Sequence, residues 1–554
     1  MTAHGGGIPK SGLLPVDSGF RNFLGIAGGV VPFKVAGEEP HKDIERLREL
    51  MRRLSRRMAT GVDGTAARDN GQIPSGYTYL LQFLAHDLVA TSIPFWALDD
   101  ASLGIRNERT SRLQLDTLYG GGPSFNPSIY APDDKANSSR TMFRMGCIEK
   151  VPATSGACPF RDIARAAVTG TKGIALEGLS EALVADPRND DHVIISQFTA
   201  LFHALHNAIV ETLPEAPTVL AAHKRFACAR DATTLIYRHI VRNELLPLIL
   251  HDTVRKHYDS GDSSERFFDA DFAKDPSGPL PLEFSHGAFR FGHAMIRDEY
   301  QINERSFTIP QLMKQTSSRN PDRMPLNAAW IVNWSRFFPL DAGHPPNLSR
   351  LIGPTVSPLL MDSQLFGPID DTNWHGLPYR DLMSAALAGV WSVPRLIDKV
   401  RPKLDERVEK AAAFEVESGT PTWKKKLKEW LEKASAATGL DGKDIETLVE
   451  DPPLPLFVLF EASIEGLDEK SKGTKLGVLG SLIVGDVLYA LLEDGGPLAV
   501  KAGTALATGL AQISEQIYGK NELGGDVSTI TSMEKLIKFV AKQNKWEAAQ
   551  PPFI

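Results

Sequence analysis

The sequence predicts a mainly α-helical fold, with one large core and little β-structure. Apolar residues recur at steps of three and four wherever a pattern is clear, and strict alternation of apolar and polar residues is scarce. The most apolar stretch, residues 476–492, carries Asp486 near its middle and is too short for a bilayer, so we expect a buried core helix there. A chain of 554 residues can bury a cofactor in such a core.

Three helices stand out along the chain. The first covers about residues 77–89, directly after a Pro-Ser-Gly turn signal. The second covers about residues 190–213, where apolar residues keep helical spacing and the good capping types Asn189 and Asp190 mark the start. The third covers about residues 283–297.

The composition is that of an ordinary globular protein. A formal net charge of -7 is unsuited to broad phosphate binding, so we expect no nucleic-acid partner. The three cysteines, Cys147, Cys158 and Cys228, have no CxxC pair and no metal-ligand spacing, which indicates neither a disulfide framework nor a zinc site. The N-terminus lacks the features of a secretory signal. We expect a cytoplasmic protein without a transmembrane segment, and export by a non-classical route stays open.

The segment LLQFLAHDL places a hydrogen-bonding side chain and a base on one helical face. Gln82 and His86 are four residues apart, so their side chains rise about one turn apart and could share one cavity. A single histidine on an apolar helix is more often a hydrogen-bonded core residue. The segment alone leaves both interpretations open.

The segment EFSHGAFRFGHAMI sets Arg290 and His293 three residues apart on one helical face. Gly292 removes side-chain bulk beside the histidine, so a large flat group could approach it. The alternative is a buried histidine bonded to a neighbouring side chain.

The segment ADPRNDDHVII places Arg188 just before a strong helix, among acids that favour a helix N-terminus. An arginine there could point into a cleft. An ion pair at the helix end is the more common role for such a residue.

Together, in this order and spacing, the three segments resemble the animal-type haem peroxidase family, of which myeloperoxidase and lactoperoxidase are members. QFLAHDL is similar to the distal histidine motif, DPRNDD to the distal arginine motif and AFRFGHAMI to the proximal histidine motif. Further similar segments include FHALHNAIV, WIVNWSRFFP and LPYRDLMSAALAG. The resemblance runs from about residue 71 to residue 540.

The resemblance implies a helical fold that holds haem b between a distal and a proximal helix. His293 would bind the iron, with Arg290 also on the cofactor. The residue that accepts a hydrogen bond from the proximal histidine is an asparagine in the family, and Asp381 takes its place here. A carboxylate gives the imidazole more anionic character and a stronger electron push.

On the distal side, the resemblance gives each motif residue a role. His86 would act as base and then acid on hydrogen peroxide. Arg188 would stabilise developing negative charge, and Gln82 would order peroxide or water by hydrogen bonding.

Three positions depart from the mammalian pattern of covalent haem links. Ala85 stands where an aspartate forms an ester, and His192 stands where myeloperoxidase has a methionine that forms a sulfonium bond. Asp191 replaces the second ester-forming residue, a glutamate, and is one methylene shorter. We therefore expect a mostly non-covalent haem and ordinary peroxidase chemistry on organic donors.

The family also binds calcium beside the distal helix. The resemblance aligns Asp87, Thr110, the Arg112 carbonyl and Asp116 with its ligands, which are the oxygen donors that a hard cation prefers. Gln114 stands where a carboxylate is expected, which weakens the case for calcium.

Four stretches follow from composition and resemblance together. Residues 1–70 are interpreted as an N-terminal extension that wraps the core, and residues 71–397 as the haem-binding core. Residues 398–455, rich in Lys, Glu and Ala, are interpreted as a charged helical insertion. Within it, residues 422–433 could dock on a membrane or a partner, although charged runs are usually only solvated faces. Residues 456–554 would complete the core with C-terminal helices.

The favoured function is a haem peroxidase that takes hydrogen peroxide and a small-molecule electron donor, either organic or a halide, as in a response to oxidative stress. One alternative is a fatty-acid dioxygenase of the cyclooxygenase-like branch. Those enzymes place a radical tyrosine three residues before the proximal histidine, where this chain has Arg290. The other alternative is a haem-binding protein without turnover, which has no evident need for Gln82, His86 and Arg188 together. The donor and the oligomeric state stay open.

Overall fold

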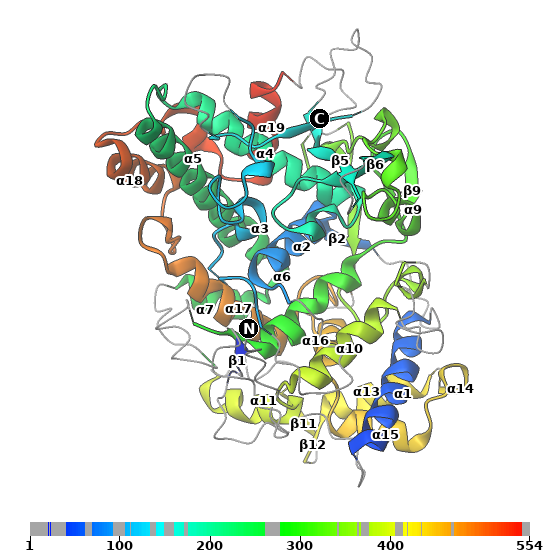
Figure 1. Cartoon of the computed structure of the whole chain (residues 1–554). Helices are drawn as coiled ribbons and strands as arrows, with labels where there is room; N and C mark the ends of the chain where they lie inside the picture. Colours follow the sequence, from blue (N-terminus) through cyan, green and yellow to red (C-terminus); the bar gives the residue numbers. More distant parts are fainter. Residues whose placement is uncertain are drawn as a thin grey trace.

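The architecture is mainly α-helical, as the sequence predicts (Figure 1). The computed structural model describes residues 20–21, 23, 40–60, 69–91, 106–110, 112–132, 140–148, 160–170, 175–260, 267, 278–340, 343–362, 365–366, 376–404, 414–417, 419–433, 435–466 and 470–545. The α-helices in these ranges are α1 Pro40–Ala59, α2 Gly76–Leu88, α3 Asp116–Tyr119, α4 Val193–Thr212, α5 Val219–Ile240, α6 Leu246–Ile249, α7 Asp252–Asp259, α9 Ile309–Met313, α10 Leu377–Ala388, α11 Val393–Val400, α13 Thr422–Glu432, α14 Ser435–Thr438, α15 Gly442–Glu450, α16 Leu454–Ile464, α17 Val478–Glu493, α18 Leu506–Tyr518 and α19 Met533–Gln543.

Shorter helical turns connect these helices. The 3₁₀ turns are η4 Pro127–Ile129, η6 Pro187–Asp190, η9 Ala288–Met295, η10 Pro321–Arg323, η11 Ala328–Trp330, η12 Trp334–Arg336, η13 Pro358–Met361, η14 Arg401–Lys403, η15 Gly496–Leu498 and η16 Gly525–Thr529. Two further turns, η7 Val241–Leu245 and η8 Glu283–Gly287, are π-helical.

Strands form only two-stranded pairs in the described ranges, which confirms the prediction of little β-structure. They are β1 Phe20–Arg21, β2 Asp69–Pro74, β3 Met145–Cys147, β4 Phe160–Ile163, β5 Arg165–Thr169, β6 Ala175–Ala182, β7 Leu280–Pro281, β8 Glu299–Gln301, β9 Ser306–Thr308, β10 Leu348–Arg350, β11 Val416–Glu417 and β12 Thr420–Pro421. β1 pairs with β7 in parallel, and the other pairs, β2 with β10, β3 with β4, β5 with β6, β8 with β9 and β11 with β12, are antiparallel. Cys147 and Cys228 are free thiols, and Cys158 lies outside the described residues.

Two helices, α4 and α17, are buried along almost their whole length and lie in the core. Residues 478–492 of α17 are all buried, which confirms the core helix that the sequence predicts there. α4 is long and apolar enough to cross a membrane by length and composition, and 94% of its apolar window is buried inside the molecule, as in a core helix. The ring of Phe83 on α2 stacks on Phe202 of α4, with the two centroids 5.1 Å apart. This packing fixes α2, and the side chains on its other face, against the core.

The start of α4 differs from the prediction. The N-cap is His192, whose side chain accepts a hydrogen bond from the Ile195 amide, so Asn189 and Asp190 do not cap this helix. They lie in the preceding turn η6, which has Pro187 in its first turn and its own cap from the Asp186 carboxylate. The chain therefore makes two capped turns in succession, which leaves the Asn189 side chain available for another contact.

The segment that carries His293 is a helix of unusual type, not the regular α-helix predicted for residues 283–297. The π-helical turn η8 leads directly into the 3₁₀ helix η9. Residues three apart eclipse one another in a 3₁₀ helix, so Arg290 and His293 lie one above the other. Gly287 allows the close approach of α16, because a Cβ built there would lie 2.5 Å from Leu454 Cδ2.

The helices α13, α14 and α15 lie beside the N-terminal helix α1 (Figure 1). Arg57 of α1 donates two hydrogen bonds to the Trp430 carbonyl, at 2.9 and 2.7 Å, and its guanidinium lies 3.8 Å from the indole centroid. Arg53 of α1 pairs with Asp444 at 2.8 Å. The buried side chains of α13 are Trp423, Leu427 and Leu431. This charged stretch therefore has an apolar face of its own; much of residues 1–70 lies outside the described ranges.

A buried histidine in α4 makes the fold sensitive to acid. The ring of His203 stacks on Phe143 with centroids 4.0 Å apart, and neither ring nitrogen has a hydrogen-bond partner among the described residues. Burial lowers the pKa of His203 to about 3, from an ordinary value of 6.5. Below pH 6.5, His203 therefore binds a proton in the unfolded chain but stays neutral in the folded chain. The free energy of unfolding falls as the pH falls toward 3.

The substitution His203→Phe keeps the stacked ring and removes this titration. We expect the free energy of unfolding of the variant to fall less than that of the wild type between pH 6.5 and about 4.5, by roughly 2 to 3 kcal/mol. Urea denaturation at the two pH values measures the difference. Equal losses in the two proteins would contradict the assignment.

Candidate functional site

One face of α2 is partly accessible. Most of α2 is buried, but Gln82 and Ala85 are partly accessible, and His86 beside them has 7% of its surface exposed. These positions share one helical face because they are three and four residues apart. On η9, Arg290 and His293 are likewise partly accessible among buried neighbours. Each segment therefore presents its chemically active side chains on one accessible stripe, formed by Gln82, Ala85 and His86 on α2 and by Arg290 and His293 on η9.

The two stripes belong to neighbouring segments. A Cβ built on Gly292 of η9 would lie 3.9 Å from Leu81 Cβ on α2, which is van der Waals contact. The charge of Arg188 also reaches Arg290, where it helps to lower the pKa of that guanidinium after the larger effect of burial. The structure thus brings the three sequence segments of interest into one region.

The contacts of His86 fix which ring nitrogen carries the proton. Its Nδ1 lies 2.9 Å from Asn189 Oδ1. The other end of the Asn189 amide, Nδ2, donates to the Thr117 carbonyl at 3.0 Å, so the oxygen must face the histidine. Because an amide oxygen only accepts, Nδ1 of the imidazole is the donor. The lone pair of His86 is therefore on Nε2, where it is available as a base.

Burial keeps this imidazole neutral. It lowers the pKa of His86 to about 3, and the nearby Arg188 charge adds to the effect. A neutral ring can take a proton at Nε2 throughout the physiological pH range.

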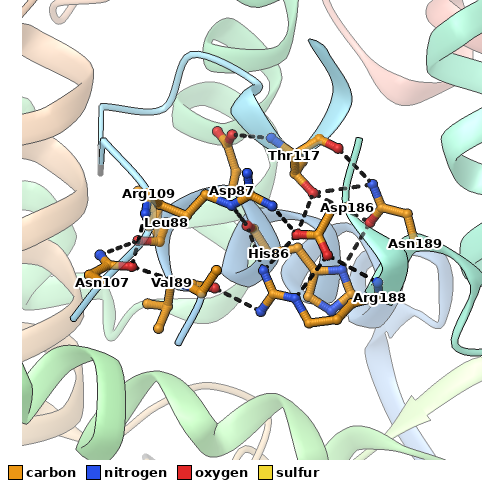
Figure 2. Close-up of polar contacts among 11 residues, drawn as sticks. His86, Asp87, Leu88, Val89, Asn107, Arg109, Thr117, Asp186, Arg188 and Asn189 are labelled. Atoms are coloured by element: carbon orange, nitrogen blue, oxygen red, sulfur yellow. Dashed lines mark hydrogen bonds and ion pairs between the residues drawn. The ribbon is translucent and has the colours of Figure 1, made fainter. Parts of the chain in front are cut away.

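Arg188 is held at the end of α2, beside His86 (Figure 2). It donates to the Val89 carbonyl at 2.7 Å and to the His86 carbonyl at 3.0 Å. Its Nε and Nη2 also donate to the two oxygens of Asp186, at 3.0 and 2.7 Å. With 34% of the side chain exposed, the guanidinium is anchored on one edge and accessible on the other.

Asp186 is the anchor of this arrangement. Its carboxylate is 1% exposed and also pairs with Arg109, which donates through Nε to the His86 carbonyl at 3.1 Å. Burial alone would raise the pKa of Asp186, but Arg188, His86 and Arg109 hold that pKa far below its usual value. The carboxylate thus stays charged and fixes both arginines against α2. Sequence reasoning missed Asp186, Asn189, Thr117 and Arg109, and only the position of the first two within DPRNDD could have pointed to them.

On the other segment, His293 and Arg290 converge on one carboxylate. His293 Nδ1 lies 2.6 Å from Asp381 Oδ2, and Arg290 Nη1 lies 3.6 Å from Asp381 Oδ1. Asp381 is on α10 and is only 10% exposed. An ionised carboxylate only accepts, so Nδ1 is the donor and the lone pair is again on Nε2. No partner for Nε2 exists among the described residues, and 34% of the side chain is accessible.

The charged groups around the two stripes are accessible and yet desolvated. Arg290 has 30% of its side chain exposed, although burial lowers its pKa. Asp191 is exposed, although burial raises its pKa to about 7. Both observations hold when the accessible atoms face an internal space that protein encloses. An imidazole lone pair on each of the two neighbouring segments, with the guanidiniums of Arg188 and Arg290 beside them, is a set of groups that suits the iron and the acidic side chains of a haem.

The residues aligned with calcium ligands lie in part together. Asp87 is buried and accepts hydrogen bonds from the Leu115 and Thr117 amides, at 3.1 and 3.3 Å. Burial, and next the charge of Asp116, raise the pKa of Asp87 to about 7. Thr110 Oγ1 donates to Asp116 Oδ2 at 2.6 Å, and Arg112 is exposed. In the described ranges no three His, Cys, Asp or Glu side chains form a group that could hold a metal ion.

Comparison with protein families gives a match to the animal haem peroxidase family over residues 128–335. This range contains Arg188, Arg290 and His293, whereas His86 and Asp381 lie outside it. The match confirms the resemblance identified in the sequence. No curated protein matched the chain.

Solved structures with the same fold cover far more of the chain. Peroxidase A from Dictyostelium discoideum is 13% identical, covers 96% of this chain and 97% of its own, and has a TM-score of 0.52. A Tyr-to-Phe variant of Oryza sativa fatty acid alpha-dioxygenase with palmitic acid is also 13% identical, covers 89% of this chain and 80% of its own, and has a TM-score of 0.51. At this identity the comparison shows a shared fold alone.

The assigned tautomer of His86 gives a test of the site. We expect nitrogen-15 NMR of histidine-labelled protein to show a neutral His86 with its proton on Nδ1 from pH 8 to pH 5, because the pKa is about 3. In Asn189→Leu the fixed acceptor is lost, so the two tautomers should mix. A proton on Nε2 in the wild type, or a titration near pH 6.5, would show the assignment to be wrong.

Proposed function

We propose that this chain is a member of the animal haem peroxidase family, whose model matches residues 128–335, and that it uses hydrogen peroxide to oxidise a small organic donor or a halide. The observation that carries the proposal is the state of the two histidines. His293 is oriented by Asp381 so that its Nε2 lone pair is free, and His86 also has a free Nε2 lone pair in the same region. One suits a metal ligand and the other suits a base.

The proposed cofactor is haem b, which His293 would hold through the iron and Arg290 would hold through an acidic side chain. Haem supplies the iron that reacts with peroxide and the capacity to take electrons from a donor. Asp381 accepts from His293 Nδ1 and thereby raises the basicity of Nε2. Ala85 carries no group that could form an ester, and Asp191 is short for one, so we propose that most of the haem is bound without a covalent link.

The distal residues would divide the work on hydrogen peroxide. His86 would take a proton at Nε2 from one peroxide oxygen and return it to the other, which would leave as water, and the haem would supply the two electrons for cleavage of the O–O bond. The guanidinium of Arg188 stabilises the negative charge that develops on the leaving oxygen. Since Asp186 and two backbone carbonyls already hold Arg188, little reorganisation is needed when that charge appears.

Dioxygenation of a fatty acid is the second candidate, because a fatty acid alpha-dioxygenase shares the fold. The described geometry favours peroxidase chemistry over it. Arg290, three residues before His293, contacts Asp381 and offers no phenol for a radical. A haem protein without turnover is less favoured too, because the Asn189 contact gives His86 the tautomer that a base requires.

We also propose that calcium binds at the C-terminal end of α2, through Asp87, Thr110, the Arg112 carbonyl and Asp116. The support is the cost of the buried Asp87 charge, which the two backbone amides do not offset fully. A divalent cation would compensate that charge and the neighbouring Asp116.

The function is tested with protein loaded with haemin and freed of unbound pigment. We expect hydrogen peroxide to change the Soret spectrum and a following donor to restore it, in a screen of phenols, halides and unsaturated fatty acids. His293→Ala should lose stable haem uptake because it removes the iron ligand. His86→Leu should keep the haem and react with peroxide about 10²- to 10⁴-fold more slowly.

The exposed His223 provides the matched control, since His223→Ala should bind haem and react as the wild type does. Full haem content in His293→Ala would refute the axial assignment. A spectrum that peroxide leaves unchanged would favour the binding-only function, and consumption of oxygen with a fatty acid would favour the dioxygenase.

Calcium binding is tested by thermal unfolding at pH 8, with chelator or with added calcium. In chelator, Asp87→Asn should raise the melting temperature, because the charged form of Asp87 is disfavoured in the fold above its pKa of about 7. With calcium, the wild type should gain stability and the variant should not. The exposed Asp322→Asn is the control, and a wild type indifferent to calcium would contradict the site.

A further inference from the structure

We propose that His192 is a positioning residue, which turns the side-chain amide of Gln82 so that only its N–H donors face the space beside His86. The proposal rests on the function proposed above and concerns how the distal side of that site is polarised. It assigns a task to a histidine at the start of α4, outside the catalytic trio of Gln82, His86 and Arg188.

The first step is the tautomer of His192. Its Nδ1 lies 3.2 Å from the backbone nitrogen of Ile195, as the N-cap of α4. A backbone N–H can only donate, so Nδ1 is the acceptor and carries no proton. In a neutral ring the proton must then be on Nε2.

The ring is neutral because it is buried. His192 is 7% exposed, and burial lowers its pKa to about 3, with smaller effects from His86 and Arg319. The edge of the Tyr79 ring packs against it, with centroids 5.3 Å apart. The imidazole therefore has one tautomer and little freedom to rotate.

The second step is the orientation of Gln82. His192 Nε2 lies 2.9 Å from the end of the Gln82 side chain. Since Nε2 donates, the atom that it meets must be the amide oxygen Oε1. The amide nitrogen of Gln82 is on the other side, and it has no hydrogen-bond partner among the described residues. A glutamine could present either end of its amide, and here the helix cap selects the donor end.

The consequence is a distal side with two opposite and fixed polarities. His86 offers the lone pair of Nε2, because its Nδ1 proton is in the hydrogen bond that Asn189 accepts. Gln82 offers N–H donors, because its amide oxygen accepts a hydrogen bond from His192. A molecule with both a proton to give and a lone pair to share, such as hydrogen peroxide or water, satisfies both groups at once. A small anion without a proton is held by the donor side alone.

Fluoride binding to the ferric haem-loaded protein tests the orientation, because fluoride accepts hydrogen bonds and has no proton to give. His192→Asn keeps an N-cap side chain, but it is too short to hold Gln82. We expect fluoride to bind this variant about tenfold more weakly, because the variant loses one hydrogen bond to a charged acceptor. Gln82→Leu should weaken it equally, and the double variant should weaken it no further. The shift of the visible spectrum with fluoride concentration gives the dissociation constant.

The chain offers a matched control at another histidine cap. His251 accepts from the Thr253 amide at 3.3 Å as the N-cap of α7. His251→Asn should cost similar stability and leave the fluoride constant unchanged. This comparison separates the loss of a helix cap from the loss of the Gln82 orientation.

If His192→Asn binds fluoride as tightly as the wild type while Gln82→Leu does not, the positioning role is wrong and the peroxidase proposal stands. If the wild type takes up no haem, the proposed function itself fails. Should His192→Asn not fold, Gln82→Glu decides. A carboxylate still accepts from His192 but has no donor for the pocket, so fluoride binding must weaken, and unchanged binding would overturn the orientation.

Discussion

The contact of His293 Nδ1 with Asp381, at 2.6 Å, is the interaction on which the site depends. It joins the 3₁₀ helix η9 to α10 and determines that the proximal imidazole presents a lone pair at Nε2. The 3₁₀ geometry places Arg290 directly over His293, so the guanidinium shares the same carboxylate at 3.6 Å. Asp381 therefore divides its charge between an imidazole N–H and a guanidinium, and the balance sets how basic the free nitrogen becomes.

On the distal side, backbone groups determine the polarity of side chains. The Thr117 carbonyl orients Asn189, which gives His86 its tautomer, and the Ile195 amide orients His192, which gives Gln82 its amide direction. Burial then keeps both rings neutral, because a charged imidazole would lose its hydration. A backbone N–H always donates and a backbone carbonyl always accepts. Both series of hydrogen bonds, from Thr117 to His86 and from Ile195 to Gln82, therefore keep their direction over a wide range of pH.

The sequence could predict the helices and the order of the motifs, because both depend on local spacing. Gln82 and His86 share a face through the helical repeat, and the apolar run at 476–492 is buried as expected. The predicted start of α4 was wrong. The sequence has several capping residues in succession, and it does not show that they belong to two separate turns, capped by Asp186 and His192. The switch from π-helical to 3₁₀ structure before His293 occurs where Gly287 packs closely against Leu454 of α16, a long-range contact that local propensity does not contain.

Long-range partners were the other part that the sequence could not predict. Asp186 and Arg109 are 77 residues apart, and only the fold shows that they meet at the carbonyl end of α2. Asn189 was interpreted as a cap because asparagine is a good capping residue type, whereas its partner His86 is 103 residues away. Asp381 was placed by resemblance alone, and its distance from His293 comes from the structure.

Resonance Raman spectroscopy of the reduced haem-loaded protein tests the proximal contact most directly, through the stretching frequency of the bond between iron and histidine. A hydrogen bond from Nδ1 to a carboxylate strengthens that bond, so the account predicts a band in the wild type that moves to lower frequency in Asp381→Asn. A band that stays at the same frequency in the variant would contradict it, and so would the absence of any iron–histidine band in the wild type.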